Sequence, residues 1–146
     1  MPHMLRQLAK LSPSEWSLLA RLSSLSLFVS YQLYGKPLPF VVQRLVYRAQ
    51  IAHWLWKGQR SCPYDLDQLA RVTGIAARFC LGTGYCLARS LLLFWLLRRN
   101  GQVVNLCVGI RKEHAVLHGH AWVEINEKVV AEDPAFLDQF ETMLRF

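Results

Sequence analysis

Cys86 is the residue of this chain best suited to nucleophilic chemistry. A glycine-rich run over 80–85 precedes it, and an apolar run of good helix formers follows it and ends at Arg98-Arg99-Asn100-Gly101. This pattern places Cys86 at the N-terminus of a helix, where unpaired N–H groups and a partial positive charge favour the reactive thiolate over the thiol. The same residue type is also common as a small core residue, so the downstream residues decide between the two interpretations.

His120 is the base that Cys86 would need. It lies in an apolar segment from His118 to Ile125 that alternates as a strand does. The alternation places His118, His120, Trp122 and Glu124 on one face and Ala121, Val123 and Ile125 on the other. A strand packed on a helix can hold its imidazole beside the helix start, as thiol–imidazole pairs require.

Asp133 is our candidate for the group that orients the imidazole. It follows a short strand predicted over 128–131, which a turn at Asn126-Glu127 joins to the strand of His120. Neighbouring antiparallel strands bring such positions side by side, and a carboxylate there can hold the histidine tautomer. Asp133 can equally be a turn residue before Pro134, and Glu132 is a rival for the same role.

The remaining elements predict an α+β fold of one compact unit. Ser12, Pro13 and Glu15 form a capping box for a helix over about 13–34. Helical spacing predicts a second helix after Pro39, reaching to Lys57-Gly58, and a third over about 66–78 that Asp65 caps. Strands are expected over 103–110, 118–125 and 128–131, so residues 1–79 form a helical layer and residues 80–146 form the core that carries the chemistry.

The segments around Cys86 and His120 resemble a known family. Cys-Leu-Ala-Arg-Ser-Leu from Cys86, Val-Gly-Ile-Arg from Val108 and His-Ala-Trp-Val-Glu from His120 are similar to the leader peptidases of lasso-peptide biosynthesis. These belong to the transglutaminase-like, papain-related superfamily. The resemblance covers residues 80–146, and the helical first half matches only in size and character.

The resemblance implies a cysteine peptidase that removes the leader from a ribosomally made precursor. Cys86 would be the nucleophile, His120 the general base and acid, and Asp133 the orienting group, with an acyl-enzyme intermediate and no cofactor. The implied partners are the precursor peptide, a separate leader-binding protein and an ATP-dependent macrolactam cyclase. The backbone N–H of Cys86 would be one oxyanion donor, with Tyr85 or Thr83 as candidates for the second.

Three other functions use the same residues differently. In transglutaminase-like acyl transfer an amine, rather than water, would release the acyl-enzyme, and a non-catalytic scaffold would only bring precursor and cyclase together. His114, His118 and His120 with Cys80 and Cys86 lack the paired short spacings of a structural zinc site, so we expect no metal. The other thiols, Cys62 and Cys107, form no disulfide pattern with Cys80 and Cys86.

Charge is distributed unevenly along the chain. The net charge of +7 arises wholly within residues 1–60, which carry eight Lys or Arg and the single acid Glu15. No cluster of Lys and Arg forms a phosphate-binding stripe, which disfavours nucleic acid as a partner. The basic, apolar first half could dock the leader or its carrier, or it could be an ordinary solvated helical layer. We expect a cytoplasmic protein, because the sequence shows neither a signal peptide nor an apolar stretch that could span a membrane.

Overall fold

The fold is α+β, as the sequence predicts. A computed structural model describes residues 8, 11–55, 64–80 and 85–146. Its helices are α2 (Pro13–Gly35), α3 (Leu38–Leu55), α4 (Leu66–Cys80), α5 (Tyr85–Arg99) and α6 (Pro134–Leu137). Its strands are β1 (Val104–Glu113), β2 (Val116–Ile125), β3 (Lys128–Val130) and β4 (Glu141–Arg145).

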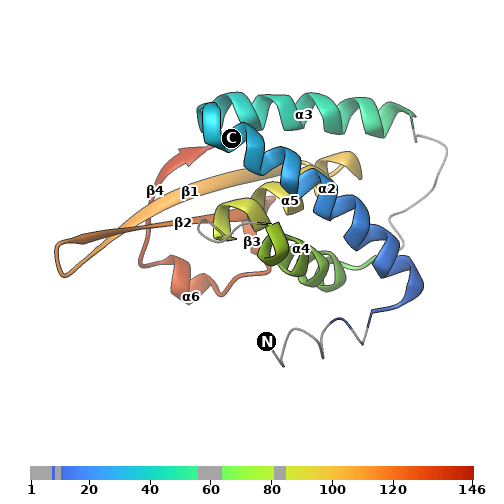
Figure 1. Cartoon of the computed structure of the whole chain (residues 1–146). Coiled ribbons are helices and arrows are strands. Elements are labelled where there is room, and N and C mark those ends of the chain that lie inside the picture. Colours follow the sequence, from blue (N-terminus) through green and yellow to red (C-terminus); the bar gives the residue numbers. More distant parts are fainter. Residues whose placement is uncertain (1–7, 9–10, 56–63, 81–84) are drawn as a thin grey trace.

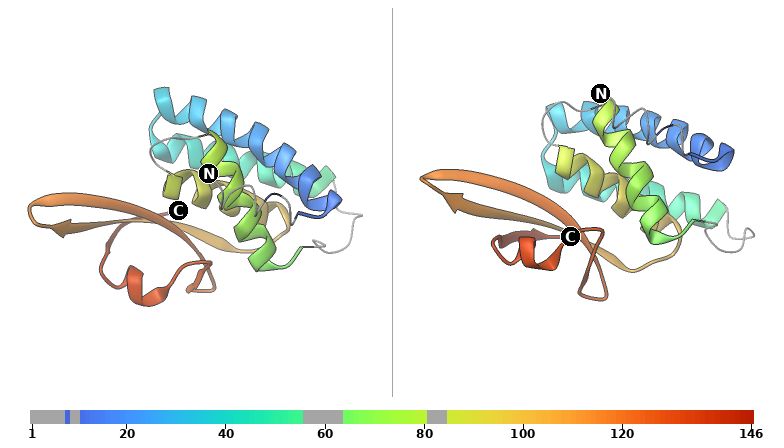
Figure 2. Two further views of the ribbon diagram at one scale, coloured as in Figure 1. Left: turned by 60° about the horizontal axis from the view of Figure 1, so that its bottom comes forward. Right: turned by 90° about the horizontal axis from the view of Figure 1, so that it is seen from below.

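The four strands form one antiparallel sheet in the order β3-β2-β1-β4. Helices α2 to α5 gather on one side of the sheet and α6 lies on the other (Figure 1). The β1–β2 hairpin extends well beyond the helices, which is clearest when the molecule is turned (Figure 2). The two faces of β2 therefore meet different layers: Val123 packs in the large helical core, and Trp122 packs in a smaller cluster with Cys107 and Leu137.

Helix α5 is the centre of the structure. It contacts α2, α3 and α4 on one side and β1 and β2 on the other. Its buried residues therefore surround the helix instead of forming a stripe. They are Ala88, Ser90, Leu91, Leu92, Leu93, Phe94, Leu96 and Leu97.

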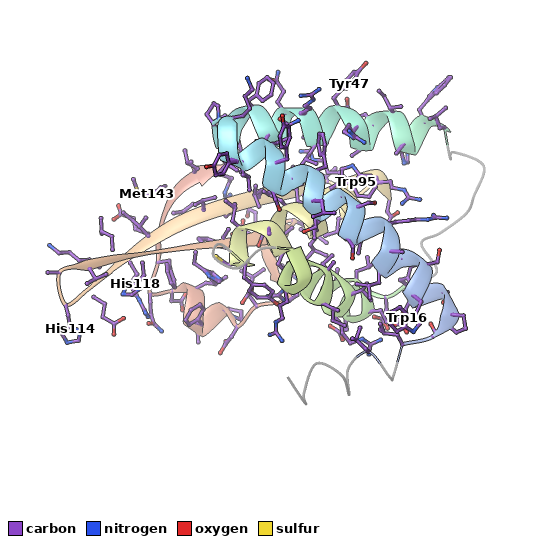
Figure 3. All side chains as sticks on the ribbon, in the orientation of Figure 1. Trp16, Tyr47, Trp95, His114, His118 and Met143 are labelled. Carbon is purple, nitrogen blue, oxygen red and sulfur yellow. The ribbon has the colours of Figure 1, made fainter. Side chains whose placement is uncertain are left out.

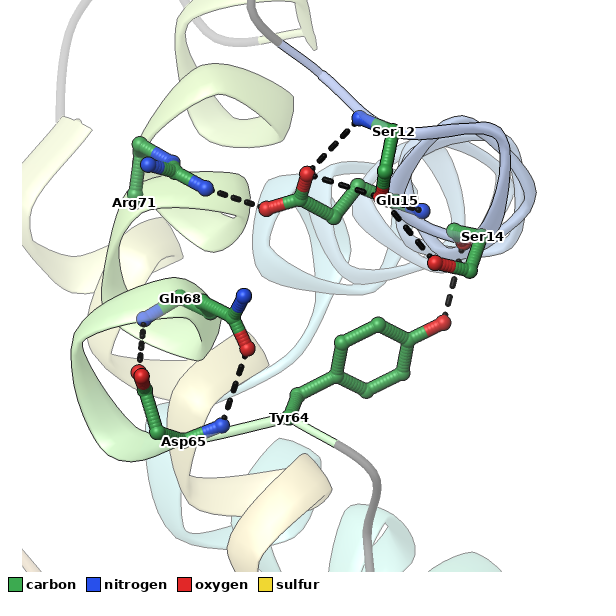
Figure 4. Close-up of polar contacts among 7 residues, drawn as sticks. All are labelled: Ser12, Ser14, Glu15, Tyr64, Asp65, Gln68 and Arg71. Atoms are coloured by element: carbon green, nitrogen blue, oxygen red, sulfur yellow. Dashed lines mark hydrogen bonds and ion pairs between the residues drawn. The ribbon is translucent and has the colours of Figure 1, made fainter.

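The starts of α2 and α4 are joined by polar contacts (Figure 4). Ser12 and Glu15 form the predicted capping box, in which the Ser12 N–H donates to the Glu15 carboxylate at 2.8 Å. The same carboxylate pairs with Arg71 of α4. Asp65 accepts from the Gln68 N–H at 2.7 Å, which confirms its capping role. These contacts fix α4 against α2, and α4 in turn packs on α5.

The structure extends several predicted elements. α4 continues to Cys80, beyond its predicted end near residue 78. Gly74 within it lies against Tyr85, whose hydroxyl would be 3.1 Å from a Cβ at that glycine. His114 and Ala115 adopt positive φ and form a two-residue turn, so β1 and β2 run to this turn instead of ending before it. α6 and β4 were not predicted, because both are short and their sequences carry no clear periodicity.

Candidate active site

Cys86 lies in the first turn of α5, as the sequence predicts. Its backbone N–H is one of the first four of the helix, which have no intrahelical partner. The side chain is half-buried and forms no disulfide. The Cys86 thiol is therefore held near the positive end of the central helix with partial access from outside.

His120 lies beside this thiol. Hydrogen bonding to His120 is the largest influence on the pKa of Cys86 and lowers it, against the opposing effect of burial. Contacts with Cys86 and then with Glu132 raise the pKa of His120 to about 9. Because the thiol pKa falls while the imidazole pKa rises, the pair favours a thiolate next to an imidazolium.

Glu132 is the carboxylate that the structure brings to the imidazole. Its Oε1 lies 3.7 Å from Nε2 of His120, which is an ionic contact longer than a hydrogen bond. Burial raises the pKa of Glu132, but His120 and the Arg89 guanidinium together hold it below its usual value. Glu132 is therefore ionised and faces an imidazole that gains from a negative neighbour.

Arg89 fixes the position of Glu132. It lies three residues after Cys86 on α5, and its Nη1 donates to Glu132 Oε1 at 2.6 Å. Its Nη2 donates to the Ala131 carbonyl at 2.8 Å, so both ends of its guanidinium hold the chain that follows β3. The helix that presents the thiol thus also anchors the carboxylate next to the imidazole.

Asp133 occupies a different place from the one that the sequence led us to expect. Its carboxylate accepts from the Ala135 N–H at 3.0 Å and caps α6. Among the described residues, the carboxylate within 4.0 Å of the His120 ring belongs to Glu132. The chain leaves the sheet at Ala131, which has a φ of 60°, so the expected register between Asp133 and His120 does not form.

Aromatic rings pack against the imidazole on the face of the sheet that carries α6. Phe136 meets the His120 ring edge-on at 5.3 Å between centroids, and Phe140 lies at 5.4 Å. Trp122 is stacked at 6.5 Å and donates to Glu124 at 2.9 Å. These rings shield the imidazole from water, which strengthens its interactions with the charged neighbours.

A family comparison agrees with this arrangement. The family model of the transglutaminase-like superfamily matches residues 37–145, which is most of the chain. The chain belongs to the transglutaminase-like superfamily. That superfamily includes cysteine peptidases and acyl transferases. Neither a curated protein nor a solved structure matched the chain.

Two of the three predicted site residues therefore meet in this transglutaminase-like protein, and Glu132 lies where Asp133 was expected. Phe136 and Phe140 were missed, since they lie within and just after α6, a short helix that the sequence pattern did not reveal. Arg89 pairs with an acid, as its place one turn after the helix-start cysteine predicts, because that spacing puts it on the same helix face.

The other candidate groups lie apart from the site or outside the described residues. His114 and His118 lie toward the tip of the β1–β2 hairpin (Figure 3). Within the described ranges, no three His, Cys, Asp or Glu side chains gather as a metal site requires. The part of the chain that the structure describes does not include Cys62, Thr83 or the side chain of Cys80. In the described part of the chain, no helix is both long and apolar enough to cross a membrane.

Proposed function

We propose that this protein is a cysteine peptidase that removes the leader from a ribosomally made lasso-peptide precursor. The observation that carries the peptidase chemistry is the contact between Cys86, in the first turn of α5, and His120, whose Nε2 lies 3.7 Å from Glu132 Oε1. This contact lowers the pKa of the thiol and raises that of the imidazole. A thiolate beside an imidazolium supplies both the nucleophile and the acid that amide cleavage needs.

The reaction would proceed in two steps. The Cys86 thiolate attacks the carbonyl carbon of the scissile peptide bond, and the C–N bond breaks as His120 gives its proton to the departing amine. The resulting thioester is attacked by water, from which His120 takes a proton, and the carboxylate product leaves with the thiolate restored. The Cys86 N–H, which has no partner within the helix, is one donor to the oxyanion that forms in each step.

The orienting group in this proposal is Glu132 and not Asp133. The ionic contact of Glu132 with His120 and its attachment to Arg89 support this role, whereas the Asp133 carboxylate is engaged in capping α6. Glu132 does not touch the reacting atoms. It is a positioning residue that keeps the imidazole turned toward Cys86 and stabilises its charge.

The partners in this proposal are the precursor peptide, a leader-binding protein and an ATP-dependent macrolactam cyclase. The supporting feature is the surface of α2 and α3, where Arg44 and Arg48 are exposed and lie over the Phe28 ring at 6.0 and 4.5 Å. Glu15, the single acid of residues 1–60, is buried and paired with Arg71, so it does not compensate this surface charge. Large exposed apolar side chains accompany the cations, namely Leu27, Tyr31, Tyr34, Tyr47 and Trp54.

The test is mass spectrometry of the precursor after incubation with the protein and the leader-binding partner. The precursor and the partner are those encoded next to a cyclase gene. We expect two fragments whose masses sum to the precursor plus one water. An adduct with an added primary amine, formed in preference to hydrolysis, would identify the protein as an acyl transferase. An unchanged precursor would favour a scaffold, and the Cys86→Ala protein is the control for contaminating peptidases.

A further inference from the structure

The edge of β2 that faces β3 is paired with a strand over only part of its length. From Val123 to Ile125 this edge pairs with β3. At Ala131 the positive φ of 60° turns the chain out of the sheet. Among the described residues, no strand pairs with β2 on this side before Val123, although β1 continues to pair on the other side as far as Val116.

The register determines which backbone groups face this edge. The two-residue turn at 126–127, with φ of 49° and 63°, makes Ile125 and Lys128 the hydrogen-bonded pair that closes the hairpin. In an antiparallel strand every second residue directs its N–H and C=O to the same side. Every second residue before Ile125 therefore directs its backbone N–H and C=O to the edge on which β3 lies. These residues include Ala121, Gly119 and Leu117.

Cys86 lies at the point where β3 would have continued. The Ala121 N–H hydrogen bonds to the Cys86 thiol, and the Ala121 carbonyl accepts from Ser90 Oγ at 2.8 Å. Helix α5 therefore satisfies both edge groups of Ala121. The next edge groups belong to Gly119, about 7 Å along the strand.

The described residues leave the β2 edge beyond Ala121 open. Gly119 and Leu117 are exposed, and a Cβ built on Gly119 meets nothing within 4 Å. Within the described residues, no backbone or side-chain group pairs with their edge N–H and C=O groups. A row of unpaired backbone groups on a strand edge is a template for another extended chain.

We propose that the edge groups of Gly119 and Leu117 bind an extended segment of the substrate polypeptide, which adds a strand to β2 and places a peptide bond at Cys86. This inference rests on the proposed function. The occupant is an extended peptide because backbone N–H and C=O groups in strand register are complementary to another peptide backbone. The site is continuous with the thiol, since Ala121 binds Cys86 and the next edge groups along β2 begin two residues away.

In this mode of binding the affinity comes from backbone hydrogen bonds and depends little on the side chains of the bound peptide. Main-chain hydrogen bonds form with almost any extended peptide, whereas proline or N-methylated residues at the paired positions cannot donate. We therefore expect the flanks of the cleaved bond to tolerate many side chains but not the loss of a paired N–H.

The first experiment measures alkylation of Cys86 by mass spectrometry of the intact and digested protein. Two alkylating probes are used, and each carries a tri-alanine chain. One probe has an iodoacetyl group at the N-terminus of the chain, and the other has a chloromethyl ketone at the C-terminus. Each probe is compared with a counterpart whose backbone nitrogens are methylated. Each lost hydrogen bond corresponds to roughly a 2- to 10-fold change in rate at a net value of about 0.5–1.5 kcal/mol. We expect at least one parent probe to react with Cys86 several-fold faster than its methylated counterpart, and equal rates for both pairs would overturn the proposal.

The second experiment does not depend on the reactivity of the thiol. Amide hydrogen exchange is followed by NMR in the Cys86→Ala protein, with and without a saturating acetyl-hexaalanine amide made soluble by terminal lysines. The amides of Gly119 and Leu117 should exchange several-fold more slowly with peptide present. Met143, which lies in β4 on the opposite edge of the sheet (Figure 3), supplies the control amide and should not change.

The two measurements separate this inference from the proposed function. If iodoacetamide fails to modify Cys86 in preference to Cys107, the proposed nucleophile is wrong, and protection of Gly119 and Leu117 still supports strand addition. If Cys86 reacts but neither amide is protected and methylation has no effect, the nucleophile stands and strand addition at this edge is wrong.

Discussion

Two thiols of this chain lie near an arginine-bound carboxylate, yet their acidities move in opposite directions. At the first site Glu132 is bound by Arg89, and His120 lies between this carboxylate and Cys86. At the second, Glu124 pairs with Arg145 at 3.0 Å, and its negative charge acts directly on the buried Cys107.

The intervening imidazole accounts for the difference. Burial, and then the charge of Glu124, raise the pKa of Cys107 to about 11, which keeps it a neutral thiol. At the first site His120 carries the positive charge that Glu132 stabilises, and this charge lowers the pKa of Cys86. A carboxylate therefore suppresses a thiolate when it acts directly and supports one when it acts through a histidine.

The largest expected effect comes from removing each thiol in turn. Cys86→Ala should abolish precursor cleavage, because no other described thiol is paired with an imidazole. Cys107→Ala should retain turnover, with unfolding made easier by about 1 kcal/mol through the small cavity left in the core. Cleavage assays and thermal denaturation of both variants measure the contrast, and full turnover by the Cys86→Ala protein would remove Cys86 from the mechanism.

Replacing the two neighbouring carboxylates should give the next largest difference. Glu132→Gln removes the charge facing His120, and we expect kcat to fall by about 10²- to 10⁴-fold, the range reported for acid–base groups and their orienting partners. Asp133→Asn keeps a good helix cap, so its kcat should stay within a few-fold of the parent. Rates of cleavage and of Cys86 alkylation distinguish the two, and the opposite order of damage would return the orienting role to Asp133.

The pH dependence of cleavage should follow the protonation of the His120 imidazole. Cleavage needs the imidazolium to protonate the leaving amine, so activity should fall about tenfold per pH unit above about 9, the pKa of His120. The raised pKa also stabilises the fold fully below pH 6.5 and this contribution is lost as pH rises through about 9. In His120→Gln the pH profile of Cys86 alkylation should move upward, and an unmoved profile would show that His120 does not lower the thiol pKa.

The smallest effect is expected far from both thiols. Arg44→Glu combined with Arg48→Glu reverses exposed charge on α3 and should raise the KM for the leader complex while kcat stays within a few-fold. The increase should shrink at high salt, because exposed charges are screened. Steady-state kinetics at two salt concentrations measure it, and an unchanged KM would place docking on apolar surface.

The sequence was sufficient for the elements that depend on local signals. The capping box at Ser12 and Glu15, the helix start at Cys86 and the alternation around His120 are fixed by neighbouring residues, and the structure confirms each of them. The α+β class followed from the same local patterns, as did the Asn126-Glu127 turn.

The tertiary structure decided which distant groups meet. Glu132 and Asp133 are adjacent in the sequence and chemically alike, so no local pattern could choose between them. The choice depends on the positive φ at Ala131, which ends β3 and turns the chain, and on Arg89, which holds Glu132 from a helix 43 residues earlier. Register beyond a strand end is set by such long-range contacts, and for this reason the open edge of β2 beside Cys86 became visible only in three dimensions.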